Sequence, residues 1–400
     1  MAVKPPAEVD LTPGLVRALL AEQHPDLAGL PLRLVAHGWD NATFRLGPDL
    51  AVRLPRRSAA ADLVLHEQRW LPELARHCPL PVPAPVRTGR PSAAFPWAWS
   101  VVPWLDGRHA ADQPVPDRAR WAERLADAIA GLHVPAPPDA PRNPVRGGPL
   151  TGRAAALADR IAAGHLDRFT PDARARADAL WRTALDAPQW SGPPVWLHGD
   201  PHPANLVVTV QRPRPDATAA RAMPAAPHGT TEDAPHGTTE DAPRGTTEDA
   251  PRGTTRCPPH GTAEDPPHVT TGCPRDGATD HAPNHTTECP PHPSEGADRG
   301  DLVGLLDFGD LGAGDPACDL ATAWLTFDAA GRASFRARID RLASSHGPAD
   351  AGRWQRAAGW ALVMASAMVA HGDDDPTIAG IGAHTIVELL GHPEDAPHPH

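Results

Sequence analysis

The sequence predicts an α+β protein of two lobes, a small N-terminal lobe built on an antiparallel sheet and a larger, mainly helical C-terminal lobe. Three observations indicate this. Short strands separated by Gly- and Asp-containing turns open the chain, helical periodicity dominates after about residue 113, and an octapeptide repeat interrupts the second half. We therefore expect a first lobe at 1–105, a second lobe at 106–225 and 298–400, and a repeat insert at 226–297.

The N-terminal lobe is predicted from alternating apolar segments. Strands are expected at 32–38, 41–47 and 50–56, which would form a three-stranded meander. Apolar residues near helical spacing predict a helix at 61–77. After a Pro-rich bend, residues 97–107 read as a further strand followed by a turn.

The C-terminal lobe shows the spacing of amphipathic helices. Residues 116–133 place four large apolar side chains on one face, and shorter helical stretches follow at 153–163 and 171–186. The longest apolar run, around 357–370, is too short to span a bilayer and predicts a buried helix. The apolar face of 116–133 consists of Trp121, Leu125, Ile129 and Leu132.

The repeat insert has a composition that cannot build a core. Octads of the type APHGTTED run in register through 226–297, and they contain no Leu, Ile, Phe, Met or Trp. Such a segment cannot bury enough apolar surface to offset its conformational entropy, and a period of eight without an apolar position cannot stack as a solenoid. We therefore expect the insert to be disordered.

Two interpretations of the insert compete. Its histidines, together with Cys257, Cys273 and Cys289, would allow a metal-binding module. However, the equal spacing of these cysteines follows from the octad period, and the insert has no C-x-x-C pair. An expanded linker is the favoured interpretation.

The bulk composition excludes several classes of protein. The net charge is −12 and there is no basic stripe, which argues against a nucleic-acid partner. The N-terminus lacks the pattern of a signal peptide, and no segment predicts a membrane span. The 5 cysteines form no dense framework, so a cytoplasmic location is expected.

Two polar turns carry the chemistry that the sequence suggests. The first is VWLHGDPHPANLVV at 195–208, and the second is DLVGLLDFGD at 301–310. If the insert is set aside, the strands beside these turns become neighbours in one hairpin, which would bring Asp200, Asn205 and Asp307 to the same end. Two carboxylates and an amide oxygen are hard ligands, which suit Mg²⁺ shared with nucleotide phosphates.

A zinc site is the alternative for the first turn. His198, Asp200 and His202 alternate in the way that metal ligands on a strand do. No soft ligand is found nearby, and the downstream Asp307 favours a magnesium site, so we treat His202 as structural.

The two motifs together resemble a known family. H-G-D-x-x-x-x-N followed by D-F-G is similar to the aminoglycoside phosphotransferase (phosphotransferase enzyme) family, whose members have a protein-kinase-like fold. The resemblance covers nearly all of the chain outside the repeat, and it implies ATP and Mg²⁺ as cofactors. The matching residues are His198, Gly199, Asp200, Asn205, Asp307, Phe308 and Gly309.

The resemblance implies roles for these residues. Asp200 would be catalytic, because it would orient the substrate hydroxyl and accept its proton. Asn205 and Asp307 would hold Mg²⁺ on the ATP phosphates, and His198 would support the loop. Asp319 fits a structural role near the hairpin.

The first lobe would bind the nucleotide. Arg53 stands where the family carries a strand-borne lysine, a departure that keeps the positive charge and adds a fork of donors. Glu67 on the following helix would pair with Arg53. Gly38 belongs to the loop expected over the phosphates, and the backbone near Val102 and Trp104 would meet the adenine.

The resemblance implies an ATP-dependent transfer of the γ-phosphate to a hydroxyl of a small molecule such as an aminoglycoside-like antibiotic, an amino alcohol or a sugar. The acids at 373–375 would attract a cationic acceptor or would form a solvated loop with a helix cap, and the second interpretation is favoured. The alternatives are a catalytically inactive, pseudokinase-like nucleotide-binding protein and a metal-binding module formed by the His/Cys octads.

Overall fold

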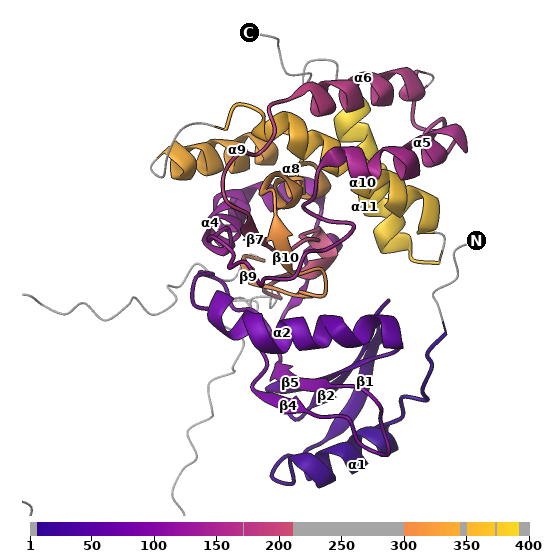
Figure 1. Cartoon of the computed structure of the whole chain (residues 1–400), viewed down its shortest axis with the longest axis vertical. Coiled ribbons are helices and arrows are strands. Elements are labelled where there is room, and N and C mark those ends of the chain that lie inside the picture. The colour runs from indigo at the N-terminus through magenta and orange to yellow at the C-terminus, as the bar shows by residue number, and fades with distance from the viewer. Residues whose placement is uncertain (1–5, 171, 211–299, 345–349, 373, 392–400) are drawn as a thin grey trace, which may run out of the picture. The chain divides into compact units, whose positions relative to one another are not determined.

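The computed structural model describes residues 6–170, 172–210, 300–344, 350–372 and 374–391. Within these ranges the expected α+β architecture of a small sheet lobe and a larger helical lobe is confirmed (Figure 1). The described residues of both lobes belong to one compact unit. The predicted repeat insert at 226–297, its cysteines and Asp373 lie outside the described residues, so the disorder, the metal binding and the lobe boundaries remain predictions.

The N-terminal lobe is a five-stranded antiparallel sheet in the order β1-β2-β3-β5-β4. The predicted meander is confirmed, and in addition a helix that the sequence analysis did not predict precedes it. The elements are α1 (Pro13–Gln23), β1 (Leu32–His37), β2 (Asn41–Leu46), β3 (Leu50–Pro55), η1 (Ser58–Ala60), α2 (Ala61–Leu74), β4 (Arg87–Gly89) and β5 (Trp99–Pro103).

The alternation of β3 sends its side chains to two different environments. Val52 and Leu54 are fully buried in the apolar cluster that α1 shares with the sheet. Arg53 lies between them in sequence and therefore points to the opposite face, where α2 carries the buried Glu67. The pleat of one short strand thus separates a packing face from a charged face.

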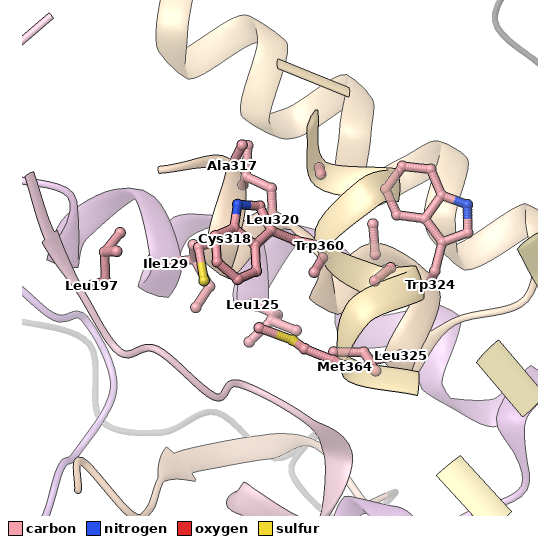
Figure 2. Packing of buried hydrophobic residues seen from close by; sticks show 14 of the residues in the cluster. Leu125, Ile129, Leu197, Ala317, Cys318, Leu320, Trp324, Leu325, Trp360 and Met364 are labelled. Carbon is pink, nitrogen blue, oxygen red and sulfur yellow. The ribbon is translucent and has the colours of Figure 1, made fainter. Parts of the chain in front are cut away.

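The C-terminal lobe is a helical assembly around one large core (Figure 2). The stretch predicted as one helix at 116–133 is divided into three segments, and its four apolar side chains are all buried, as expected. The helices are α3 (Val115–Arg118), η3 (Ala119–Trp121), α4 (Ala122–Leu132), η4 (Leu150–Arg153), α5 (Ala154–Ala162), α6 (Ala173–Asp186), α7 (Ala317–Leu320), α8 (Thr322–Thr326), α9 (Ala329–Ser344), α10 (Arg353–His371) and α11 (Pro376–Leu390).

Two small sheets connect this core to the polar turns. β8 (Leu206–Val208) pairs antiparallel with β9 (Leu302–Leu305), and β6 (Arg108–His109) pairs with the other edge of β8. In the chain, β6 follows β5 and precedes η2 (Ala110–Asp112). β7 (Val195–Leu197) pairs with β10 (Gly312–Gly314). The predicted hairpin across the insert is therefore present.

The long apolar segment forms α10, which is buried along most of its length. Across the described ranges, no helix has the length and hydropathy needed to cross a bilayer. Asp375 accepts hydrogen bonds from the N–H groups of Thr377 and Ile378 at the start of α11, so it has the helix-cap role that the sequence analysis favoured.

Candidate active site

The backbone of the turn after β7 is hydrogen-bonded to a buried carboxylate. Asp319 is completely buried and accepts hydrogen bonds from the backbone N–H groups of His198 and Gly199, both at 2.8 Å. Gly199 has a φ of 86°, a conformation that glycine adopts without strain. Asp319 therefore fixes the backbone from which Asp200 projects, and its Oδ2 also lies 3.2 Å from His133 Nε2.

His198 links this turn to the second one. Its Nδ1 accepts a hydrogen bond from the Asp200 N–H at 3.2 Å, so the proton is on Nε2, which donates to the Leu306 carbonyl at 2.9 Å. The imidazole is fully buried and its centroid lies 4.4 Å from that of Phe308. These contacts connect the two polar turns, and the supporting role of His198 stays a prediction.

Asp200 is held between an arginine and a histidine side chain. Its Oδ1 lies 3.3 Å from Arg146 Nη2, and its Oδ2 lies 3.3 Å from His202 Nε2. Burial opposes ionisation of this carboxyl, but His202 and Arg146 outweigh it and hold the pKa of Asp200 well below its usual range. Asp200 is therefore an oriented carboxylate at neutral pH.

Asn205 and Asp307 are brought together by the backbone. Asn205 Nδ2 donates to the Asp200 carbonyl at 3.0 Å, and the Asn205 carbonyl accepts from the Leu306 N–H at 2.8 Å. Asp307 follows directly with a φ of 57°, the one positive value at a non-glycine residue in the described ranges. Such backbone costs energy and is concentrated at functional sites. The Asp307 side chain is 56% exposed.

Arg53 connects the two lobes. Its Nη1 lies 2.8 Å from Glu67 Oε2, and its Nη2 lies 3.2 Å from Asp307 Oδ1. Burial raises the pKa of Glu67, and the charge of Arg53 counters part of that rise. For Arg53, burial disfavours the charged form, but Glu67 and Asp307 more than compensate and raise its pKa. The guanidinium therefore carries a full positive charge.

The loop between β1 and β2 is closed tightly around Gly38. The Gly38 N–H donates to the Asn41 carbonyl at 2.8 Å, and a Cβ at Gly38 would lie 3.0 Å from that oxygen. Arg56 donates to the Gly38 carbonyl at 2.9 Å, and Arg57 pairs with Asp40 at 2.8 Å. Asp40 also lies near enough to Asp307 for the two charges to interact, so the loop borders the same site.

The segment expected to meet the adenine is partly used by the sheet. Val102 is buried and paired with Ala51, and the Trp104 N–H donates to the Asp49 carbonyl at 2.8 Å. The Trp104 ring lies under the guanidinium of Arg45, 4.4 Å from the ring centroid. The Trp104 N–H is therefore engaged within the protein, and contact with a base would fall to other groups of this segment.

The sequence profile of the phosphotransferase enzyme family matches residues 31–216 and 296–360, which is more than half of the chain. The chain belongs to this family. No curated protein sequence matches the chain.

Solved structures of antibiotic phosphotransferases share the fold of this phosphotransferase. The GDP and kanamycin complex of APH(2")-IIia aligns with a TM-score of 0.54 and 13% identity, covering 94% of this chain and 98% of that one. The GDP complex of wild-type aminoglycoside 2'-phosphotransferase-IIIa gives 0.54 and 13%, covering 94% and 97%. At this identity the likeness establishes the protein-kinase-like fold and leaves the substrate open.

The sequence analysis did not predict three residues of this site. Arg146 Nε donates to the Gly199 carbonyl at 2.9 Å and lies 3.5 Å from Asp310 Oδ2. Asn143 Nδ2 donates to Asp310 Oδ1 at 2.7 Å. Asn143 and Arg146 come from the 141–149 segment, which has no motif of its own, whereas Asp310 stands in the quoted D-F-G-D stretch and its acidity was a signal.

The donor set fits a magnesium–nucleotide complex better than zinc. Among the described residues, no three His, Cys, Asp or Glu side chains gather closely enough to bind a metal alone. Asn205 uses its amide nitrogen on Asp200 and keeps its oxygen for another partner, while Asp307 presents an exposed carboxylate. Mg²⁺ is commonly held by one or two such oxygens together with phosphate and water.

Proposed function

We propose that this phosphotransferase moves the γ-phosphate of ATP to a hydroxyl of a small molecule. The observation that carries the proposal is the backbone hydrogen bond from the Leu306 N–H to the Asn205 carbonyl, because it sets the turn of Asp200 beside the turn of Asp307. The contact of Arg53 with Asp307 supports it, since it places a cation of the first lobe at the same point.

Asp200 would act on the acceptor. Its carboxylate would accept a hydrogen bond from the acceptor hydroxyl and would take the proton as the oxygen–phosphorus bond forms and the bond to the leaving ADP oxygen breaks. A carboxylate with a lowered pKa is a weak base, so its main contribution would be to orient the hydroxyl. Arg146 and His202 would keep the carboxylate in one orientation.

Arg53 would act on the nucleotide, with Glu67 as its fixed partner. Its guanidinium would place a permanent charge on the phosphates, and a fork of donors can contact two phosphate oxygens. Asn205 and Asp307 would hold Mg²⁺, which when bound neutralises phosphate charge. The loop around Gly38 would cover the phosphates from the first lobe.

A panel of alcohols tests this function. The full chain is incubated with Mg²⁺ and either ATP or GTP, together with aminoglycosides, amino alcohols or sugars, and both nucleoside diphosphate release and the phosphorylated product are measured. Asp200→Asn should abolish acceptor-dependent release and should leave nucleotide binding intact. Asp178→Asn, on the exposed face of α6, is the matched control and should behave as wild type.

One alternative gives a different result in the same assay. A catalytically inactive nucleotide-binding protein would bind ATP and would release no acceptor-dependent diphosphate with any alcohol. The presence of Asp200, Asn205 and Asp307 in connected turns favours turnover. The metal-binding module proposed for the octads falls outside the described residues, and zinc titration of a 226–297 peptide tests it separately.

A further inference from the structure

The two polar turns touch each other directly at Asp310 and Gly199. Gly312 of β10 pairs with Leu197 of β7, and two residues further along this register Asp310 lies opposite Gly199. A Cβ at Gly199 would lie 2.4 Å from the Asp310 carbonyl oxygen and 2.7 Å from the Asp310 Cβ. The position before Asp200 therefore cannot carry a side chain unless Asp310 is displaced.

Arg146 holds Asp200 by a single contact, although a guanidinium and a carboxylate commonly form two parallel ones. Its Nη2 donates to Asp200 Oδ1 at 3.3 Å, while its Nε donates to the Gly199 carbonyl at 2.9 Å. The same Nε lies 3.5 Å from Asp310 Oδ2. Because Nε is directed toward Gly199 and Asp310, it does not complete a paired contact with Asp200.

Asp310 is itself held by Asn143. Asn143 Nδ2 donates to Asp310 Oδ1 at 2.7 Å and lies 3.3 Å from the Asp310 carbonyl oxygen. Asn143 Oδ1 accepts a hydrogen bond from the Val145 N–H at 2.9 Å, which fixes the orientation of the amide. Asn143 thus binds one oxygen of the Asp310 carboxylate and leaves Oδ2 to face Arg146.

The segment that carries Arg146 is fixed to β10 by its backbone. The Ala313 N–H donates to the Pro141 carbonyl at 2.8 Å, and the Asp315 N–H donates to the Gly147 carbonyl at 2.9 Å. Gly147 has a φ of 67°, a conformation that glycine adopts without strain. Since the backbone is anchored on both sides of Arg146, the orientation of its guanidinium is decided by its side-chain partners.

We propose that Asp310 is a positioning residue for phosphotransfer, which directs the guanidinium of Arg146 so that Arg146 holds Asp200 by one contact only. The proposal rests on the proposed function and deepens it. Without Asp310, Nε of Arg146 would be free to join Nη2 on the Asp200 carboxylate in a paired contact. That pairing would occupy lone pairs that the acceptor hydroxyl needs, so Asp310 keeps the carboxylate of Asp200 available.

Guanidinium ion tests this arrangement without turnover. Arg146→Ala removes the side chain and leaves Asp310 beside the vacated space, and binding of guanidinium chloride to the full chain is measured by calorimetry against sodium chloride. The ion should bind Arg146→Ala, and it should bind roughly tenfold more weakly when Asp310→Asn is added, because a charge-assisted contact is lost. Arg182→Ala, which removes an exposed arginine of α6, is the control and should bind none. Absence of binding to Arg146→Ala, or equal affinity with and without Asp310→Asn, overturns the proposal.

Turnover shows whether the arrangement matters for the reaction. With Mg²⁺ and the nucleotide and alcohol that react fastest in the panel above, Asp310→Asn should lower kcat by roughly tenfold and leave KM for the nucleotide nearly unchanged. Guanidinium should restore part of the activity lost in Arg146→Ala and none of it in the double variant. A residue that served folding alone would lower stability in urea without altering this response. Wild-type kcat in Asp310→Asn, or equal restoration in both variants, contradicts the proposal.

The two proposals fail in different ways. If no alcohol is phosphorylated, the proposed phosphotransfer fails, and guanidinium binding still reports on the contact between Arg146 and Asp310. If wild-type turnover is normal and Asp310→Asn leaves kcat unchanged, the positioning role fails alone. Asp310→Asn by itself provides this second test even if Arg146→Ala does not fold.

Discussion

Arg53 and Asp307 are 254 residues apart in sequence, and yet Arg53 Nη2 lies 3.2 Å from Asp307 Oδ1. One residue belongs to a sheet strand and the other to the turn beyond the insert. Because the same guanidinium contacts the buried Glu67, this contact ties α2, β3 and the second polar turn together. The relationship makes Arg53 both a stabilising residue and a candidate phosphate ligand.

Substitutions of Arg53 should separate these two roles. Arg53→Met leaves Glu67 buried without its cation, and we expect a loss of about 3 kcal/mol in the free energy of unfolding. Arg53→Lys retains the charge but loses the fork, and it should cost roughly tenfold in kcat/KM, equal to about 1.4 kcal/mol. Urea unfolding and ADP-release assays measure the two effects. Equal stability of Arg53→Met and wild type would show that the pair with Glu67 is dispensable.

Asp319→Asn should weaken the turn of Asp200 through its backbone. An amide has one acceptor oxygen, and its NH₂ group would face a backbone N–H, so a buried donor loses its partner at a cost of about 3 kcal/mol. We expect a lower unfolding midpoint in urea and slower turnover with little change in nucleotide affinity. Asp375→Asn is the matched control, because asparagine caps a helix as well as aspartate does. Similar midpoints for both variants would count against this role.

Removing residues 226–297 should leave the hairpin intact. The Thr209 N–H donates to the Asp301 carbonyl at 2.9 Å, so the ends of β8 and β9 already meet. If the insert is the linker that its composition predicts, the deletion shortens the connection roughly fourfold. Each halving of the length lowers the entropic cost of closing the loop by roughly 0.6 kcal/mol. Stability should rise slightly and turnover should stay unchanged. Insoluble or unfolded protein after the deletion would refute the linker interpretation.

The reactivity of two buried thiols tests the stability of the C-terminal core. Burial raises the pKa of Cys78 to about 11 and that of Cys318 well above its usual range. Since the thiolate is the reactive form, iodoacetamide at pH 8 should leave both unmodified in the native protein and should label both after unfolding. Peptide mass spectrometry reads the result. Native labelling as fast as in urea would mean that this core opens readily.

Much of the N-terminal lobe and the two polar turns could be predicted because their signals are local. Alternation defined β1 to β3, and the spacing of Asp200 and Asn205 is a motif in itself. The segmentation into α3, η3 and α4 could not be predicted, because it depends on side-chain contacts with residues outside this segment. Arg118 donates to the carbonyls of Gln113 and Thr326, and Trp121 Nε1 donates to the Gln113 side chain.

Other features were missed for different reasons. The start of α1 has a sequence signal that the sequence analysis did not use, since Thr12 caps the helix and Pro13 occupies its first position. Arg146 could not be found, because an arginine in an irregular segment acquires its meaning only from the fold that sets it against Asp200. The positive φ of Asp307 also has no sequence signal, as it follows from how the turn is held by its neighbours.

The most direct test of the central claim is the effect of Mg²⁺ on ATP affinity in the Asp200→Asn variant, alone and combined with Asp307→Asn, measured by calorimetry. The account predicts that Mg²⁺ tightens ATP binding by tenfold or more, roughly 1.4 kcal/mol, when Asp307 is present, and that this gain disappears when it is replaced. An equal gain in both variants, or none in either, would contradict the claim that Asp307 holds the metal beside Asp200.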